Sequence, residues 1–456
     1  MSYPSYPEYK DAGFVGLDQV PSHWAIVRFK QILKEVNRGS QTGEEQLLSV
    51  SEYYGVKPRM EVMEDGEHLS RAESLEGYKL CEPTDLVMNI MLAWKRGLGV
   101  SDHYGIVSPS YAVFRFVCEV HARYYHYLLR SDEYIGYFKT FSSGVIDSRL
   151  RLYPEVFGRL TGLYPPLNEQ TQIARFLDHQ TARIDALIAE QQRLIELLKE
   201  KRQAVISHAV TKGLDPDVAM KDSGVEWLGE VPEHWSVASL KHALELVADV
   251  DHYMPTPVDS GIPYVMTGDL RRFASEIDLD SCKKISRDEF LKLTRKIRTS
   301  EGDVIMARYA TIGTVSYVDI SKEFVVSYSC VTIRPQVNLV SGIYLFFYFQ
   351  SDAFIQGISN AINANTQENV GVADLKEVKI ALPGIREQKG IVDEVEAKLA
   401  KSDALVDKAE RSIALMKERR SALISAAVTG KIDVRNWEPP VSETFPQSTA
   451  SEEAPA

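Results

Sequence analysis

Residues 169–211 read EQTQIARFLDHQTARIDALIAEQQRLIELLKEKRQAVISHAVT, and residues 387–429 read EQKGIVDEVEAKLAKSDALVDKAERSIALMKERRSALISAAVT. The two segments align without gaps, and 19 of the 43 aligned positions are identical. A match of this length is not a chance event, so the chain contains an internal repeat. Because each copy follows a long segment of different character, each half has one plan, a globular segment followed by a repeated segment.

The repeated segment has the pattern of a long amphipathic helix. No Pro or Gly interrupts residues 169–211. Apolar residues of the first copy fall on alternating steps of three and four: Ile173, Leu177, Ile184, Leu187, Leu194, Leu198 and Val205, with Gln180, Gln191 and Lys201 at the remaining positions. At about 1.5 Å per residue such a helix makes a rod of roughly 60 Å.

One amphipathic rod leaves its apolar stripe in water, so it needs a partner. The second copy carries Ile391, Val395, Leu405, Met416 and Leu423 at matching positions. We therefore expect the two helices to pair antiparallel and to relate the globular segments by a pseudo-twofold axis. The alternative is that each helix packs on its own globular segment.

A shorter repeat opens each half. Val20-Pro21-Ser22-His23-Trp24 returns as Val231-Pro232-Glu233-His234-Trp235. Each His stands alone beside a Trp and after a rigid Pro, so a structural role for Trp24 and Trp235 at the entry to each globular segment is favoured over a catalytic or metal site.

The globular segments have a mixed α/β pattern. Short strands with turns before them are expected within residues 80–91, 111–116, 301–309 and 324–335, and aromatic-rich buried helices within 121–138 and 341–359. The predicted fold class is therefore α+β, with two mixed α/β domains and two long antiparallel coiled-coil helices.

The composition is that of a globular protein, with 44% hydrophobic and 25% charged residues among 456. No targeting or membrane-spanning segment is expected, and four Cys without metal-ligand spacing favour a cytoplasmic location. The net charge of −12 argues against a nucleic-acid binder. However, residues 283–298 hold seven Lys or Arg against two acids, so a local basic face is expected.

No motif for catalysis is recognised. The chain lacks a phosphate-binding G-x-x-x-x-G-K-[ST] loop, a G-x-G-x-x-G turn and an H-E-x-x-H helix. The sequences YPPL and EPPV lack the Asn or Asp that precedes the prolines in amino-methyltransferases and the Tyr or Phe that follows them. We therefore predict a chain without a catalytic centre or bound metal.

The remaining chemistry is recognition, and it lies in loops that differ between the halves. Arg can read guanine, Asn and Gln can read adenine, and Ser or Thr adapts to bases or phosphates. The alternative for each residue is an ordinary turn former or solvated side chain. The predicted DNA-contacting residues are Trp94, Lys95, Arg96, Ser142, Ser143, Arg149 and Arg151 in the first half, and Arg271, Arg272, Arg308, Tyr309, Thr311, Asn363, Asn365 and Gln367 in the second.

The repeated segments together resemble a known family. The stretch from LYPPLNEQTQIARFLDHQ through AVISHAVTKGLDPD to GEVPEHW, with ALISAAVTGKIDVRNW near the end, is similar to the DNA specificity subunit of type I restriction–modification systems. The resemblance covers almost the whole chain apart from about the last twenty residues.

The resemblance implies that each globular segment is a target recognition domain that reads half of a bipartite, asymmetric site in double-stranded DNA. It implies two methyltransferase subunits and the restriction subunits as partners, with S-adenosylmethionine, ATP and Mg on those partners and no membrane association. The expected domains are 1–166 and 213–384 for recognition, 167–212 and 385–430 for the helices, and 431–456 for a partly disordered tail.

Two rival functions remain open from the sequence. One is a methyltransferase-nuclease that carries its own recognition domain, which the missing motifs oppose. The other is a coiled-coil scaffold that joins partners without reading DNA.

Overall fold

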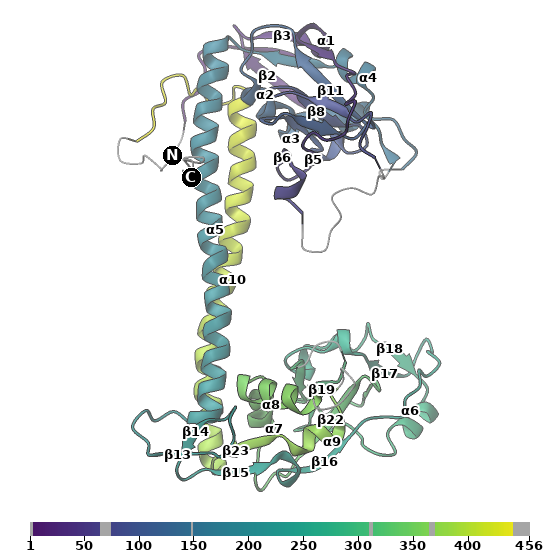
Figure 1. Ribbon diagram of the computed structural model, residues 1–456, viewed down its shortest axis with the longest axis vertical. Helices are drawn as coiled ribbons and strands as arrows, with labels where there is room; N and C mark the ends of the chain where they lie inside the picture. The colour runs from purple at the N-terminus through teal and green to yellow at the C-terminus, as the bar shows by residue number, and fades with distance from the viewer. Residues whose placement is uncertain (1–2, 64–73, 147–148, 310–312, 364–369, 441–456) are drawn as a thin grey trace. The chain divides into compact units, whose positions relative to one another are not determined.

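The computed structural model describes residues 3–63, 74–146, 149–309, 313–363 and 370–440. The chain forms two compact units, the first made of Met1–Gln191 with Arg411–Ala456 and the second of Gln192–Glu410. Each unit contains one globular part and a portion of each of the two long helices, α5 (Leu167–Lys212) and α10 (Ile385–Val428) (Figure 1). Among the described residues, no helix is both long and apolar enough to cross a membrane.

The two long helices pack against each other within each unit. In the first unit, Arg420 on α10 forms an ion pair of 2.9 Å with Asp185 on α5. In the second unit, Arg202 on α5 pairs with Asp403 on α10 at 2.5 Å. Both partners are at equivalent positions of the repeat, so the same contact is made twice. The expected pairing of the two helices is therefore present in both units, and the pairs show that the helices run antiparallel.

The buried stripe of α5 differs from the predicted one. Leu187 and Leu194 are 42% and 40% exposed, whereas Ile195 and Ile206, outside the predicted set, are buried. A regular heptad assumes one partner along the whole helix. Here Ile173 belongs to the core of the first globular part and Ile206 to that of the second, so the buried face changes along the helix.

The first globular part is built on an antiparallel sheet with the order β4-β11-β8-β9, with β3 paired to β12. Two-strand ribbons β1-β2, β5-β6 and β7-β10 surround it. The bounds are β1 Tyr9–Phe14, β2 Leu17–Pro21, β3 Ala25–Arg28, α1 Phe29–Ile32, β4 Leu33–Glu35, β5 Leu48–Ser51, β6 Gly55–Pro58, β7 Lys79–Cys81, β8 Leu86–Asn89, β9 Leu98–Val100, β10 Gly105–Val107, β11 Tyr111–Phe116, α2 Ala122–Leu129, α3 Asp132–Phe141, α4 Pro154–Arg159 and β12 Thr161–Tyr164.

The second globular part repeats this plan with the sheet order β16-β22-β19-β20 and β15 paired to β23. It adds the sheet β18-β17-β21 and the helix α6. The bounds are β13 Met220–Asp222, β14 Glu230–Pro232, β15 Ser236–Ser239, β16 Leu244–Ala248, β17 Ile262–Val265, β18 Lys283–Ile285, α6 Arg287–Leu293, β19 Val304–Ala307, β20 Val315–Tyr317, β21 Val325–Val326, β22 Cys330–Pro335, α7 Gly342–Tyr348, α8 Asp352–Asn363, α9 Val372–Glu377 and β23 Lys379–Leu382.

The prediction of one helix over residues 121–138 and one over 341–359 is wrong, because each is two helices. The helical conformation is interrupted at Ser131, between α2 and α3, and at Ser351, between α7 and α8. The Ser131 hydroxyl donates to the carbonyl of Leu128 at 2.8 Å, and that of Ser351 donates to Tyr348 at 2.6 Å. These local bonds compete with helix continuation, and apolar periodicity does not reveal them.

The repeated Val-Pro-x-His-Trp motif holds the first turn of a long helix. Trp24 Nε1 donates to Glu169 of α5 at 2.9 Å, and His23 Nε2 lies 2.7 Å from the other carboxylate oxygen. In the second unit Trp235 and His234 contact Glu387 of α10 in the same way, both at 2.9 Å. Both tryptophans are buried, so the structural role predicted for them is the one observed.

The same motif also contacts the end of the other long helix. Gly430 follows α10 with φ +76°, a conformation that favours glycine, and a Cβ there would collide with Pro21. Gly213 follows α5 with φ +77°, and a Cβ there would lie 3.3 Å from Trp235. Each globular part therefore holds the beginning of one long helix and the end of the other.

A buried tyrosine of each globular part makes a second contact with the helix end. Tyr124 of α2 donates to the carbonyl of Val428 at 3.0 Å, and Tyr344 of α7 donates to that of Val210 at 3.0 Å. Val210 and Val428 are equivalent in the repeat. The two units therefore make the same contacts between globular part and helix end, although their sequences differ.

We expect Glu169→Gln to destabilise the first unit by about 2 kcal/mol, because Tyr6, His23 and Trp24 all point polar atoms at this buried carboxylate. A glutamine amide has only one acceptor oxygen. Its NH2 group would face one of these three donors and could not accept a hydrogen bond from it. Thermal unfolding followed by circular dichroism checks this, with the exposed Glu190→Gln on the same helix as the control. Equal unfolding temperatures for the two variants would contradict it.

Candidate nucleic-acid interface

In each unit, the residue that follows β8 or its equivalent β19 contacts a residue that lies beyond α3 or α8 in the sequence. In the first unit the amide of Leu152 donates to the carbonyl of Ile90 at 2.9 Å, and in the second the amide of Val370 donates to that of Arg308 at 3.0 Å. In the first unit, the loops after β8 and after α3 carry the seven residues predicted to contact DNA, so the structure brings these residues together. In the second unit, the described part of the corresponding segments contains only Arg308 and Tyr309 of the predicted set.

The loop after β8 is tightly built around Trp94. The indole is buried, and Nε1 donates to the carbonyl of Met91 at 3.0 Å. The ammonium groups of Lys95 and Lys139 lie 5.0 and 5.3 Å from the ring centroids, which gives a cation–π arrangement on an aromatic support.

Arg96 connects this loop to α3. The residue has φ 64°, in the left-handed region, and its guanidinium pairs with Asp132. Its Nε also donates to the carbonyl of Arg130 at 3.1 Å. The observed contacts of Arg96 are therefore structural, and DNA contact by it stays a prediction.

The loop after α3 presents cations to solvent. The Ser142 hydroxyl bonds back to the last turn of α3, and Ser143 pairs with Arg151 through two backbone hydrogen bonds of 2.9 and 3.0 Å. The side chains of Arg149 and Arg151 are exposed, and Val145 between them and α3 is 97% exposed. Of the basic residues predicted in the first unit, Lys95, Arg149 and Arg151 have exposed side chains that can reach an external ligand.

Arg308 occupies the equivalent position to Ile90 and is 9% exposed. Its Nε donates to the carbonyl of Val370 at 2.9 Å, and NH1 pairs with Asp249. Burial acts to raise the pKa of Asp249, but the His252 hydrogen bond and the Arg308 charge outweigh it, so the pKa is lowered. Tyr309 beside it is partly exposed. Base reading by Arg308 stays a prediction, and its observed partners give it a structural role.

Arg271 and Arg272 differ from each other. Arg271 is exposed and donates to the Leu270 carbonyl at 2.9 Å. Arg272 lies 5.7 Å from the Phe347 ring and 3.6 Å from Asp403 of α10, and burial with the nearby Arg202 lowers its pKa. Arg272 therefore joins the second globular part to α10.

The remaining predicted residues cannot be placed by contacts. Thr311, Asn365 and Gln367 lie outside the described residues, and Asn363 is the last residue of α8, with its side chain outside what is described. Their role in DNA contact stays a prediction.

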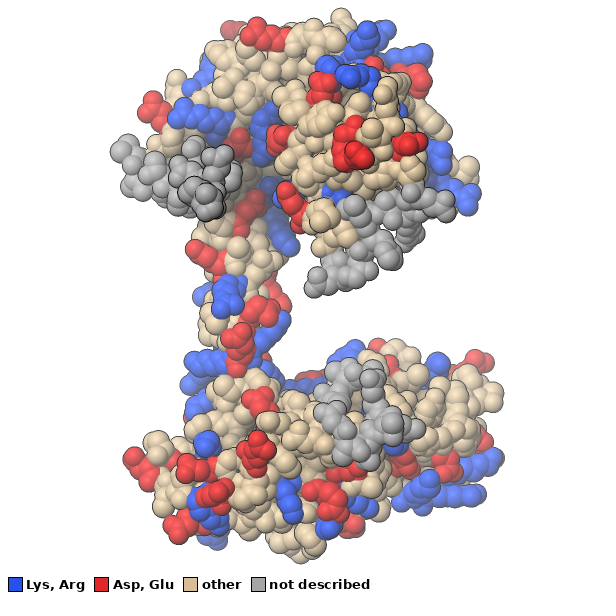
Figure 2. All heavy atoms as spheres, in the orientation of Figure 1, with Lys and Arg blue, Asp and Glu red and all other residues tan. Residues whose placement is uncertain are grey.

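The basic segment 283–298 forms a cationic face around β18 and α6. Figure 2 shows Lys and Arg gathered where α6 lies. Part of this charge is paired, with Arg287 bound to Glu323 at 2.5 Å and Lys296 to Asp251 at 2.9 Å. The side chains of Lys283 and Arg295 are exposed. The expected local basic face is therefore present in an acidic chain.

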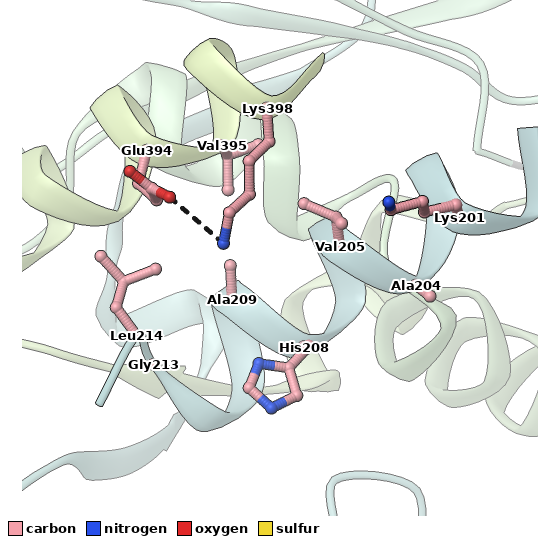
Figure 3. A pocket seen from close by; sticks show the side chains of 10 residues that line it. All are labelled: Lys201, Ala204, Val205, His208, Ala209, Gly213, Leu214, Glu394, Val395 and Lys398. Atoms are coloured by element: carbon pink, nitrogen blue, oxygen red, sulfur yellow. Dashed lines mark ion pairs between the residues drawn. The ribbon is translucent and has the colours of Figure 1, made fainter. Parts of the chain in front are cut away.

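A cavity of about 530 Å³ lies in the second unit between the end of α5 and the beginning of α10 (Figure 3). On the α10 side of the cavity, Lys398 forms an ion pair of 3.2 Å with Glu394, one turn earlier on the same helix. In the first unit Trp437 packs on Phe176, the residue equivalent to Glu394, at 5.2 Å between ring centroids. Among the described residues, no group of three or more His, Cys, Asp or Glu could hold a metal ion.

Comparison with known proteins identifies the domain of the second unit. Residues 257–406 match the family model of the type I restriction modification DNA specificity domain. The EcoBI specificity subunit of Escherichia coli is 25% identical over 275 residues, which cover 59% of this chain and 57% of that one. The EcoKI specificity subunit of E. coli K12 is 22% identical over 372 residues, which cover 77% and 75%.

The chain is similar to the type I specificity subunits, and its residues 257–406 match their DNA specificity domain. This confirms the resemblance predicted from the repeated segments. The match spans little more than half of the EcoBI subunit.

A solved structure shows the same fold for this chain. A chain from a study of complex assembly and conformational transition of the type I R-M system superposes with a TM-score of 0.65 at 14% identity, covering 91% of this chain and 99% of that one. The predicted α+β class with two domains and long helices is thereby confirmed. The pseudo-twofold relation between the domains stays a prediction.

We expect Arg308→Ala to destabilise the second unit by about 3 kcal/mol at pH 7, because it leaves Asp249 without its cation. The folded pKa of Asp249 is lowered, so its pairing stabilises the fold above the unfolded pKa and is lost as pH falls through the folded pKa. The loss caused by the variant should therefore shrink toward pH 3.

Urea unfolding at pH 7 and at low pH checks this, with the exposed Arg295→Ala as the control. A variant as stable as the wild type at pH 7 would show that Arg308 has no structural role.

Proposed function

We propose that this chain is the sequence-reading subunit of a type I restriction–modification complex, in which each unit contacts one half of a bipartite, asymmetric DNA site. One observation carries the proposal. Equivalent backbone hydrogen bonds, from Leu152 to Ile90 and from Val370 to Arg308, fix the residue after β8 and the residue after β19 against the segment beyond α3 or α8. The sequences of these segments differ, whereas the contacts that hold the long helices are the same.

This combination of a constant support and different loops suits two readers with different targets. Side chains on loops read base edges, and a rigid support fixes their register on the duplex. Arg149 and Arg151 are exposed in the first unit, and the basic face around α6 lies in the second. These cations supply attraction to phosphates that the net charge of −12 does not.

The long helices offer equivalent surfaces to two identical partners. Leu187 and Leu405 are equivalent in the repeat and are 42% and 49% exposed. Leu197 and Leu415 are also equivalent and are 45% and 65% exposed. Exposed leucines in matching positions favour docking of two copies of one protein, which we propose to be the methyltransferase subunit. In this proposal catalysis, S-adenosylmethionine, ATP and Mg belong to the methyltransferase and restriction subunits.

The proposal is tested by mapping methylated adenines in the native host with and without this gene. We expect methylation at one two-part motif to disappear. Unchanged methylation in a strain whose partner methyltransferase is active would reject the proposal. Purified chain that transfers methyl groups alone would identify a self-contained methyltransferase, and no DNA preference with methyltransferase present would identify a scaffold.

We expect Arg149→Ala combined with Arg151→Ala to weaken binding of the chain–methyltransferase complex to its DNA site by about tenfold or more, with the fold intact. If both contact phosphates, the slope of log affinity against log salt should fall by about 2. Fluorescence anisotropy at several salt concentrations measures both quantities. The exposed Arg386→Ala is the control, and affinities equal to the wild type would remove this loop from the interface.

A further inference from the structure

A large cavity in the first unit lies between the globular part and the long helices. Its volume is about 1110 Å³, and its walls come from the segments near β6 and β9, from α2, and from α5 and α10. This volume is slightly above the usual range for small-molecule sites in proteins, which ends at about 1,000 Å³. None of the loops predicted to read bases lines it except at Arg96.

The lining carries more positive than negative charge. The cations are Arg96, Arg123, Arg130, Arg420, Lys57 and Lys417. The anions are Glu52, Asp102, Asp178 and Asp185. Two of the acids orient arginines, since Asp178 bonds Arg123 at 2.9 Å and Asp185 bonds Arg420 at 2.9 Å. Both arginine side chains remain more than a third exposed.

Arg130 is held in the wall by hydrogen bonds to backbone carbonyls. Its NH1 donates to Arg96 and Leu98 at 2.6 Å and to Ser51 at 3.2 Å. Burial, followed by the charges of Arg96, Arg420 and Arg123, lowers the pKa of Arg130 to about 10. Burial and the same kind of cationic neighbours lower the pKa of His126. The positive charges are therefore close enough to repel one another, and an anion bound in the cavity would reduce this repulsion.

The second unit shows that the fold does not need these side chains. Tyr124 of α2 and Tyr344 of α7 make the same bond to a long helix, which aligns the two helices. In that alignment Arg123, His126 and Arg130 correspond to Ile343, Phe346 and Gln350. The equivalent helix therefore forms with apolar or neutral residues at these three positions.

We propose that this cavity binds the phosphodiester backbone of the DNA that the first unit reads. The inference rests on the proposed function, because that function brings a duplex to this unit. The planar guanidinium group of arginine can donate two parallel hydrogen bonds to phosphate oxygens. Asp178 and Asp185 orient the guanidinium groups of Arg123 and Arg420. Phosphates are the same in every sequence, so the site positions the duplex and does not select bases.

The test is Arg123→Gln combined with Lys417→Gln in the complex of the full chain with its methyltransferase subunits. We expect about tenfold weaker binding to the specific duplex and to an unrelated duplex, a salt slope lower by about 2, and an unchanged methylation motif. Arg123→Lys, which keeps the charge, should recover much of the affinity. The exposed Arg175→Gln, in the same unit and outside the cavity, is the control.

Four results separate the possible outcomes. Unchanged affinity with an unchanged unfolding temperature would overturn the cavity site. So would a changed methylation motif, because the cavity would then select bases. Weaker methyltransferase binding without weaker DNA binding would assign the cavity to an acidic surface of the partner and also overturn it. A wild-type complex that prefers no duplex would instead reject the proposed function itself.

Discussion

The bond between a tryptophan indole and a glutamate in the first turn of a long helix supports the rest of the structure. Glu169 is 5% exposed, and a carboxylate at that depth is stable only with strong donors around it. Trp24 and His23 supply them, and burial with the nearby Glu169 raises the pKa of Tyr6, which keeps that hydroxyl protonated as a third donor. The helix therefore begins at a fixed point on the globular part.

The Val-Pro-x-His-Trp motif also contacts the glycine that follows the C-terminal end of the other long helix. This double contact explains why the motif occurs once in each half of the chain. Pro21 and Trp24 pack on Gly430, while Pro232 and Trp235 pack on Gly213. Each globular part needs both ends, and each long helix provides one end to each part. A change in one copy of the motif would alter the beginning of one helix and the end of the other, so both copies serve one architecture.

Charge near the loops has two different uses. Arg96 and Arg308 are engaged by Asp132 and Asp249, which lie far from them in sequence, and they hold loops in shape. Arg149 and Arg151 are exposed on a loop that is fixed by backbone bonds. Residue type alone does not distinguish these roles, because a guanidinium group can form a structural ion pair as well as contact DNA. The cation-rich cavity around Arg123 and Arg130 was not found from sequence, since its walls come from five segments.

The sequence by itself determined the internal repeat, the two long helices, the α+β class and the structural role of Trp24 and Trp235. These follow from local periodicity and from side chains whose chemistry allows few alternatives. The tertiary structure decided which apolar positions of α5 are buried, where α2 ends, and which arginines reach solvent. Leu187 is exposed and Ile206 buried because the partner of α5 changes along its length. Such outcomes depend on groups brought together from distant parts of the chain, and no local pattern contains that information.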